Sequence, residues 1–218
     1  YFFHRGLANL ANAFSKLEIR HKSLFSHIAD EVLYRGTIGQ TLPQFQFDGR
    51  SLDQLANAFS KMGLHDPRIF FVLSELVKRN WKYAKHSSSS SHKLDSISLS
   101  NLLFAFGKTR LTCATSFFPQ IIQHLLPQVE FLSTIGLHVV IKACVYLSIK
   151  HSNLYEIIMK QANKNMHLFP SLLLVAMMKN FSHVDAFKHS FIRKATKQCQ
   201  INLAYFDAPL CCRLLLAF

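Results

Sequence analysis

The sequence predicts an all-α fold, an α-solenoid of stacked helical hairpins, and three observations support this prediction. The heptapeptide Leu-Ala-Asn-Ala-Phe-Ser-Lys occurs at residues 10–16 and again at 55–61. Identical copies at two places indicate an internal repeat. Weaker copies follow along the chain. Gly (7) and Pro (6) are too scarce in 218 residues for an all-β fold with many tight turns.

The repeated motif divides the chain into five hairpins and part of a sixth. It reads Asn-Leu-Leu-Phe-Ala-Phe-Gly-Lys at 101–108, and only its hydrophobic pattern remains at 140–147. The segment 173–179 restores the Lys, and 214–218 repeats the apolar residues. The predicted repeats form one array over residues 1–218, with units near 6–35, 51–80, 96–127, 133–165 and 168–198 and a partial unit at 207–218.

Each unit is expected to contain two helices. In the second unit, Ser51 and Gln54 have the spacing of a capping box at the start of a helix, and Gly63 has the place of its C-terminal cap. Asp66-Pro67 then begins the second helix. Apolar residues recur at helical spacing between these signals. Because one hairpin cannot bury both of its apolar faces, neighbouring hairpins should stack.

Two connecting segments differ from the rest of the chain. Residues 36–50 are polar and contain glycines, and residues 85–95 contain a run of five serines from Ser87 to Ser91. Neither composition suits a core. We expect both to be inserted loops at one edge of the array.

The charge balance indicates a polyanionic partner. The chain has 25 Lys and Arg against 12 Asp and Glu, a formal net charge of +13. RNA is the first candidate for such a surplus and an anionic membrane surface the second. No uninterrupted apolar stretch is long enough for a transmembrane helix, so no membrane span is predicted.

The first helix of each unit carries a polar stripe opposite its apolar side. Asn9, Asn12 and Lys16 fall within about 60° of each other on a helical wheel. Stacking of the units would align the corresponding side chains into a ladder of ammonium groups, amides and an aromatic ring. The corresponding residues of the later units are Asn57, Lys61, Lys108, Lys142, Tyr146 and Lys179.

This combination suits RNA, because ammonium groups neutralise phosphates, amides reach base edges and aromatic rings stack on bases. Further candidate RNA contacts lie at the hairpin ends, at Arg35, Lys78 and Arg79. A structural interpretation stays open, since the helix dipole favours Lys near any helix C-terminus.

No pattern of catalytic or metal-binding residues is present. The 12 His residues show no His-Glu-x-x-His spacing, and the 5 Cys residues form no Cys-x-x-Cys pair. No phosphate-binding glycine loop or nucleophile motif occurs. The sequence predicts no metal, no cofactor and no enzymatic activity.

The octapeptide Leu-Ala-Asn-Ala-Phe-Ser-Lys-Leu at 10–17 and the Ser-Leu-x-Gln start at 51–54 resemble the octotricopeptide and heptatricopeptide repeats of organellar proteins, which RAP domains often follow. The resemblance implies a mitochondrial RNA-binding protein. As a structural or accessory component of the mitochondrial ribosome, it would hold ribosomal RNA beside other ribosomal or organellar proteins. The alternatives are a transcript stability or processing factor, a protein–protein scaffold, or part of an enzyme with a nuclease-like domain elsewhere.

Overall fold

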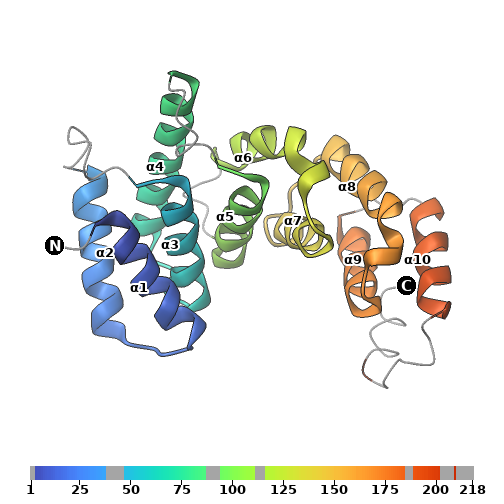
Figure 1. Cartoon of the computed structure of the whole chain (residues 1–218), viewed down its shortest axis with the longest axis horizontal. Helices are drawn as coiled ribbons and strands as arrows, with labels where there is room; N and C mark the ends of the chain where they lie inside the picture. Colours follow the sequence, from blue (N-terminus) through green and yellow to red (C-terminus); the bar gives the residue numbers. More distant parts are fainter. Residues whose placement is uncertain are drawn as a thin grey trace. The chain divides into compact units, whose positions relative to one another are not determined.

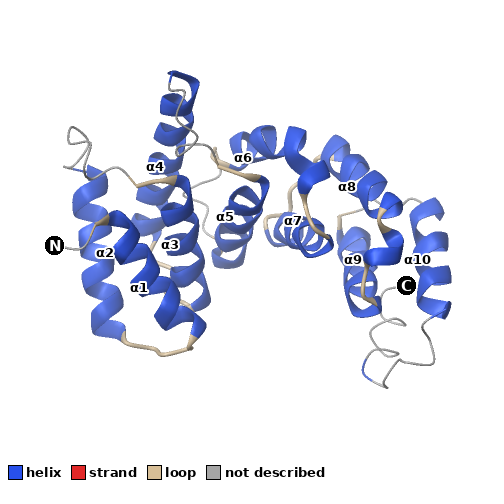
Figure 2. Cartoon of the chain, viewed as in Figure 1, coloured by secondary structure: helices blue, strands red, loops and turns tan. Residues whose placement is uncertain are grey.

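The computed structural model of the chain describes residues 3–37, 47–86, 94–110, 116–184 and 189–201, together with Pro209. These residues form ten α-helices and two short 3-10 helices, and no strand occurs among them (Figures 1 and 2). The prediction of an all-α protein is confirmed. The α-helices are α1 (His4–Lys16), α2 (Lys22–Thr37), α3 (Gly49–Lys61), α4 (Pro67–His86), α5 (Ser96–Thr109), α6 (Phe118–Leu125), α7 (Thr134–Tyr146), α8 (Ser152–Lys164), α9 (Ser171–His183) and α10 (His189–Ile201).

Aspartate side chains begin two of the helices. Asp48 Oδ1 accepts a hydrogen bond of 2.8 Å from the backbone N–H of Ser51, and Asp95 accepts one of 2.8 Å from Ser98. Each aspartate is therefore the N-cap of its helix, α3 or α5. The predicted capping box at Ser51 is wrong, because Asp48 starts α3 three residues earlier and leaves Ser51 buried in the first turn.

The end of α3 and the start of α4 follow the sequence signals. Gly63 has a positive φ of 73°, and its N–H donates to the Ser60 carbonyl at 3.3 Å. This left-handed conformation favours glycine and ends the helix. Asp66 Oδ1 accepts from the Arg68 N–H at 2.9 Å, just before the helix begins at Pro67.

Helices extend into both segments expected to be inserted loops. Helix α2 continues to Thr37 and α3 begins at Gly49, so the two ends of 36–50 are helical. Helix α4 continues to His86, within 85–95. The central parts of the two segments, 38–46 and 87–93, lie outside the described residues. The predicted partial repeat at 207–218 also lies outside them, apart from Pro209.

The chain divides into two compact units, Tyr1–Ile121 and Ile122–Phe218. In the first unit α1 packs against α3 and α3 against α5, while α2 packs against α4 (Figure 1). Helices α1, α3 and α5 form one row, and fully buried alanines allow these helices to approach closely. They are Ala8, Ala11, Ala56, Ala58 and Ala105.

Aromatic rings fill the space beside this row. Phe106 is fully buried, with its ring centroid 5.1 Å from that of Phe70 and 5.1 Å from that of Phe117. Trp81 stacks on Phe117 at 5.6 Å. These contacts join α4 to α5 and to the turn before α6, so Phe106 is a central residue of this core.

The second unit repeats the pattern of alternate packing. Helix α7 packs against α9, and α8 contacts α10. Phe181 of α9 and Phe191 of α10 meet at a centroid distance of 5.2 Å. Cys144 is a free thiol in this core, and burial raises its pKa to about 12. It packs as a small apolar residue and is unreactive at neutral pH.

We predict that Phe106→Ala lowers the free energy of unfolding of the first unit by about 3–5 kcal/mol, because it removes a buried ring and leaves a cavity. Chemical denaturation followed by circular dichroism measures this loss. Phe71→Ala is the matched control, since Phe71 on α4 is 50% exposed and its removal should cost much less. Equal losses in the two variants would contradict the packing described here.

Candidate nucleic-acid interface

Three of the predicted lysines lie at the same end of one row of helices. Lys16, Lys61 and Lys108 occupy the last turns of α1, α3 and α5, and all three are exposed. Helices α1 and α3 run in the same direction, because Arg5 contacts Asp48 near their starts and Lys61 contacts Glu18 near their ends. We call these three residues the lysine row.

One member of the lysine row has an acidic neighbour. Lys61 Nζ lies 3.6 Å from Glu18 Oε1, and the two side chains are 47% and 79% exposed. An ion pair this exposed contributes about 0–1 kcal/mol. The Lys61 ammonium can therefore exchange this partner for a phosphate at little cost.

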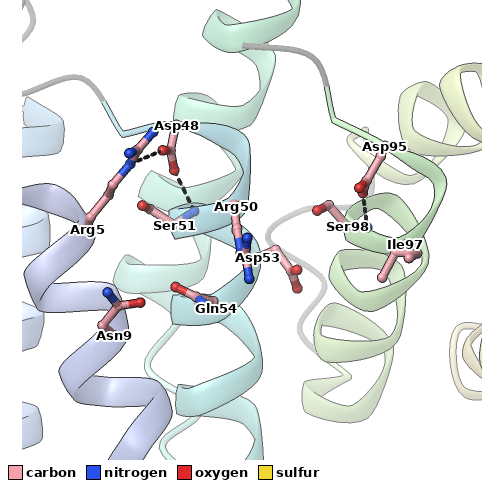
Figure 3. A pocket seen from close by; sticks show the side chains of 10 residues that line it. All are labelled: Arg5, Asn9, Asp48, Arg50, Ser51, Asp53, Gln54, Asp95, Ile97 and Ser98. Carbon is pink, nitrogen blue, oxygen red and sulfur yellow. Dashed lines mark hydrogen bonds and ion pairs between the residues drawn. The ribbon is translucent and has the colours of Figure 1, made fainter. Parts of the chain in front are cut away.

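A polar groove lies at the opposite end of the same helices (Figure 3). Its volume is about 830 Å³. Asn9 on α1 and Gln54 on α3 both point into it. Asn12, one turn further along α1, is half-buried. The groove is lined by Arg5, Asn9, Asp48, Arg50, Ser51, Asp53, Gln54, Asp95, Ile97 and Ser98.

Asp48 joins α1 to α3 at this groove. Its Oδ2 accepts a hydrogen bond of 2.8 Å from Arg5 Nε. Partial burial opposes ionisation of this carboxyl, but the hydrogen bonds from Ser51 and Arg5 outweigh burial and lower its pKa. Asp48 is therefore a carboxylate at neutral pH, and its charge faces the Arg5 guanidinium.

Asp53 lies between α3 and α5 and is only 7% exposed. It accepts hydrogen bonds from Asn57 Nδ2 at 2.6 Å and from Asn101 Nδ2 at 3.4 Å. Burial raises its pKa to about 7, and these hydrogen bonds offset only part of that effect. The Asn57 amide, which the sequence predicted to contact RNA, is therefore hydrogen-bonded to Asp53 on the same helix.

The candidates at the hairpin ends do not join the lysine row. Arg35 on α2 is buried, and its Nη2 pairs with Glu31 at 2.6 Å, one helical turn away. Lys78 on α4 pairs with Glu75 at 2.7 Å, and Arg79 donates to the Gly36 carbonyl at 3.3 Å. Because Arg35 is buried, it is not presented to solvent.

The remaining candidates belong to the second unit. The Lys142 ammonium lies 5.8 Å from the ring centroid of Tyr146, one turn further along α7, a geometry typical of a cation–π contact. Both residues are half-buried. Lys179 is exposed on α9, the helix that packs against α7.

Sequence reasoning missed the charged residues that line the groove. A repeated spacing could have revealed two of them, since Asp48-x-x-Ser51-Leu52 recurs as Asp95-x-x-Ser98-Leu99. Recurrence of an aspartate at the same distance before both helices indicates an N-cap. No comparable signal marks Asp53, whose role depends on α5.

No protein-family model matches the chain, and no curated protein shows significant similarity to it. Among the residues that the structure describes, no group of three or more His, Cys, Asp or Glu side chains could hold a metal ion. None of the described helices is both long enough and apolar enough to cross a membrane.

We predict that Asp53→Asn changes the pH dependence of stability. The folded pKa of Asp53 is raised from 3.8 to about 7, so the folded chain binds the proton more tightly than the unfolded chain. Its contribution to stability is full below pH 3.8 and is lost as the pH rises to about 7. The slope is at most about 1.4 kcal/mol per pH unit.

Urea denaturation at several pH values measures this effect. The free energy of unfolding of the Asp53→Asn variant should fall much less with rising pH than that of the parent chain. Asp30→Asn controls for removal of a charge, because Asp30 lies at an exposed position on α2. If the free energy of unfolding of the Asp53→Asn variant falls with pH as steeply as that of the parent, this carboxyl does not titrate in the expected range.

Proposed function

We propose that this chain is an RNA-binding α-solenoid. The observation that carries the proposal is the lysine row, which places one exposed cation in the last turn of each of three packed helices. The formal net charge of +13 supports a polyanionic partner. A helix dipole favours Lys near a single C-terminus, but it does not require exposed Lys in the same turn of three successive helices.

The solenoid arrangement is part of the proposal. In each compact unit, alternate helices pack together: α1 with α3 and α3 with α5 in the first, and α7 with α9 in the second. Stacked hairpins produce this alternation, because each helix packs against its equivalent in the next unit. We propose five hairpins and part of a sixth.

The charges on this face favour one orientation of a bound strand. Phosphates would lie along the lysine row, where ammonium groups neutralise them. The groove would attract phosphates less, because the carboxylates of Asp48 and Asp95 offset the positive charges of Arg5 and Arg50 there. The Asn9 and Gln54 amides point into the groove and can donate to and accept from base edges. Unpaired bases would therefore point toward the groove end of the helices.

The resemblance to organellar repeats supplies the biological setting of the proposal. We propose that the chain acts in the mitochondrion, where it holds ribosomal RNA as a structural or accessory component of the ribosome. This role needs no catalytic group. Co-sedimentation of the native protein with mitochondrial ribosomal subunits after a high-salt wash tests the setting, and its complete absence from the subunits would contradict it.

We predict that Lys16→Glu, Lys61→Glu and Lys108→Glu together abolish binding of single-stranded RNA, because the charge reversal turns attraction of phosphate into repulsion. Fluorescence anisotropy at a series of salt concentrations measures the affinity. The loss of about three phosphate contacts lowers the affinity by about 10²-fold at 0.1 M salt, before repulsion is added.

The matched control reverses three exposed cations of the first unit that lie off the lysine row. Arg20, Lys22 and Lys82 are suitable, since all three are exposed. This control carries the same net charge as the test variant and should retain most of the affinity. Equal loss in the two variants would show that net charge matters and the position of the lysines does not.

A further inference from the structure

A second group of cations lies on the second unit, away from the predicted stripe. The described part of this unit has only two acidic side chains, Glu130 and Glu156. Five exposed cations lie on α8 and α10, and we call them the α8–α10 cationic face. They are Lys160, Lys164, Arg193, Lys194 and Lys197.

The spacing of these residues places them on one side of each helix. Lys160 and Lys164 are four residues apart on α8, as are Arg193 and Lys197 on α10, so each pair is separated by about 6 Å along its helix. The opposite side of α8 is buried at Leu154 and Ile158. Helix α10 is likewise anchored by its buried residues Phe191, Ala195 and Cys199.

The two helices contact one another, and on each of them the cations lie on the side away from the buried residues. Within the described part of the chain, none of the five takes part in an ion pair. Cations one helical turn apart on the same helix repel one another. Binding of a polyanion relieves that repulsion, and the release of its counterions drives association.

The chemistry of this face distinguishes among polyanions. The aromatic residues Tyr155 and Phe191 are buried, so they cannot stack on the bases of a single strand. The apolar sides of both helices are also buried, apart from Ile201 at the end of α10, so the helices offer no continuous apolar face to a membrane surface. The exposed charged groups of the two helices are these five cations and the carboxylate of Glu156, a net positive set. Ammonium and guanidinium groups recognise phosphates without reading sequence.

We propose that the α8–α10 cationic face binds the phosphate backbone of double-stranded RNA. The inference rests on the proposed function and adds a second site to it. The lysine row of the first unit would hold an unpaired strand, and this face would hold a helical segment of folded RNA. A-form duplexes are recognised mainly by their shape and by their backbone.

The test neutralises all five cations of this face by substitution with Gln. Binding to a blunt RNA duplex of about 16 base pairs is measured by fluorescence anisotropy at a series of salt concentrations. We expect the affinity for the duplex to fall by about 10²-fold at 0.1 M salt. The slope of log affinity against log salt concentration should decrease by the equivalent of about two to three phosphate contacts.

The matched control removes the same charge from exposed cations of the first unit and should leave duplex affinity within a few-fold of the parent. Its substitutions are Arg20→Gln, Lys22→Gln, Arg68→Gln, Lys82→Gln and Arg110→Gln. Circular dichroism checks that both variants keep their helix content. An equal loss of duplex binding in test and control variants would overturn the proposal.

Two further probes separate this inference from the proposed function. Binding of a single-stranded oligonucleotide of the same length should depend on the lysine row and much less on the α8–α10 cationic face. If single strands bind through the lysine row but the five substitutions leave duplex affinity unchanged, only the further inference fails. If neither RNA binds the parent chain, both fail. Binding to phosphatidylserine vesicles, but not to the duplex, through these cations would assign the face to a membrane surface instead.

Discussion

The side-by-side packing of α1, α3 and α5 is the constraint on which the rest of the first unit depends. Helix α3 has neighbours on both sides, α1 and α5, and therefore buries most of its surface. Small residues such as Ala56 and Ala58 make this close contact possible. The same packing carries polar groups inward, including Ser60 and Asp53. The lysines at the helix ends remain exposed because nothing in the row covers them.

This packing gives the row two different ends. The three exposed lysines lie where the helices finish, and Asp48 and Asp95 cap the starts of α3 and α5, where Arg5 and Arg50 also lie. The lysines and the two capping aspartates are favourable in their places, because a helix carries a partial positive charge at its start and a partial negative charge at its end. The electrical asymmetry that orients an RNA strand in our proposal thus follows from ordinary helix stability. Asp53 is the exception, since burial makes its charge costly at neutral pH.

The repeated heptapeptide shows how far sequence can predict this structure. Its helical character and its exposed lysine were predictable from periodicity. Its burial was not. Ala13 of the first copy is exposed, whereas Ala58 of the second is fully buried, because α3 lies between two helices. The burial of Arg35 and Asp53 likewise depends on neighbouring helices. Local patterns therefore predicted the helices and the lysine row, while the groove required the packed structure.

The central claim is that RNA contacts the face formed by α1, α3 and α5. Ultraviolet cross-linking of the chain to a single-stranded RNA, followed by mass spectrometry of the attached peptides, tests it most directly. We expect cross-links in peptides from the C-terminal halves of these helices, around Lys16, Lys61 and Lys108. Efficient cross-linking confined to other helices, with none in these three, would contradict it.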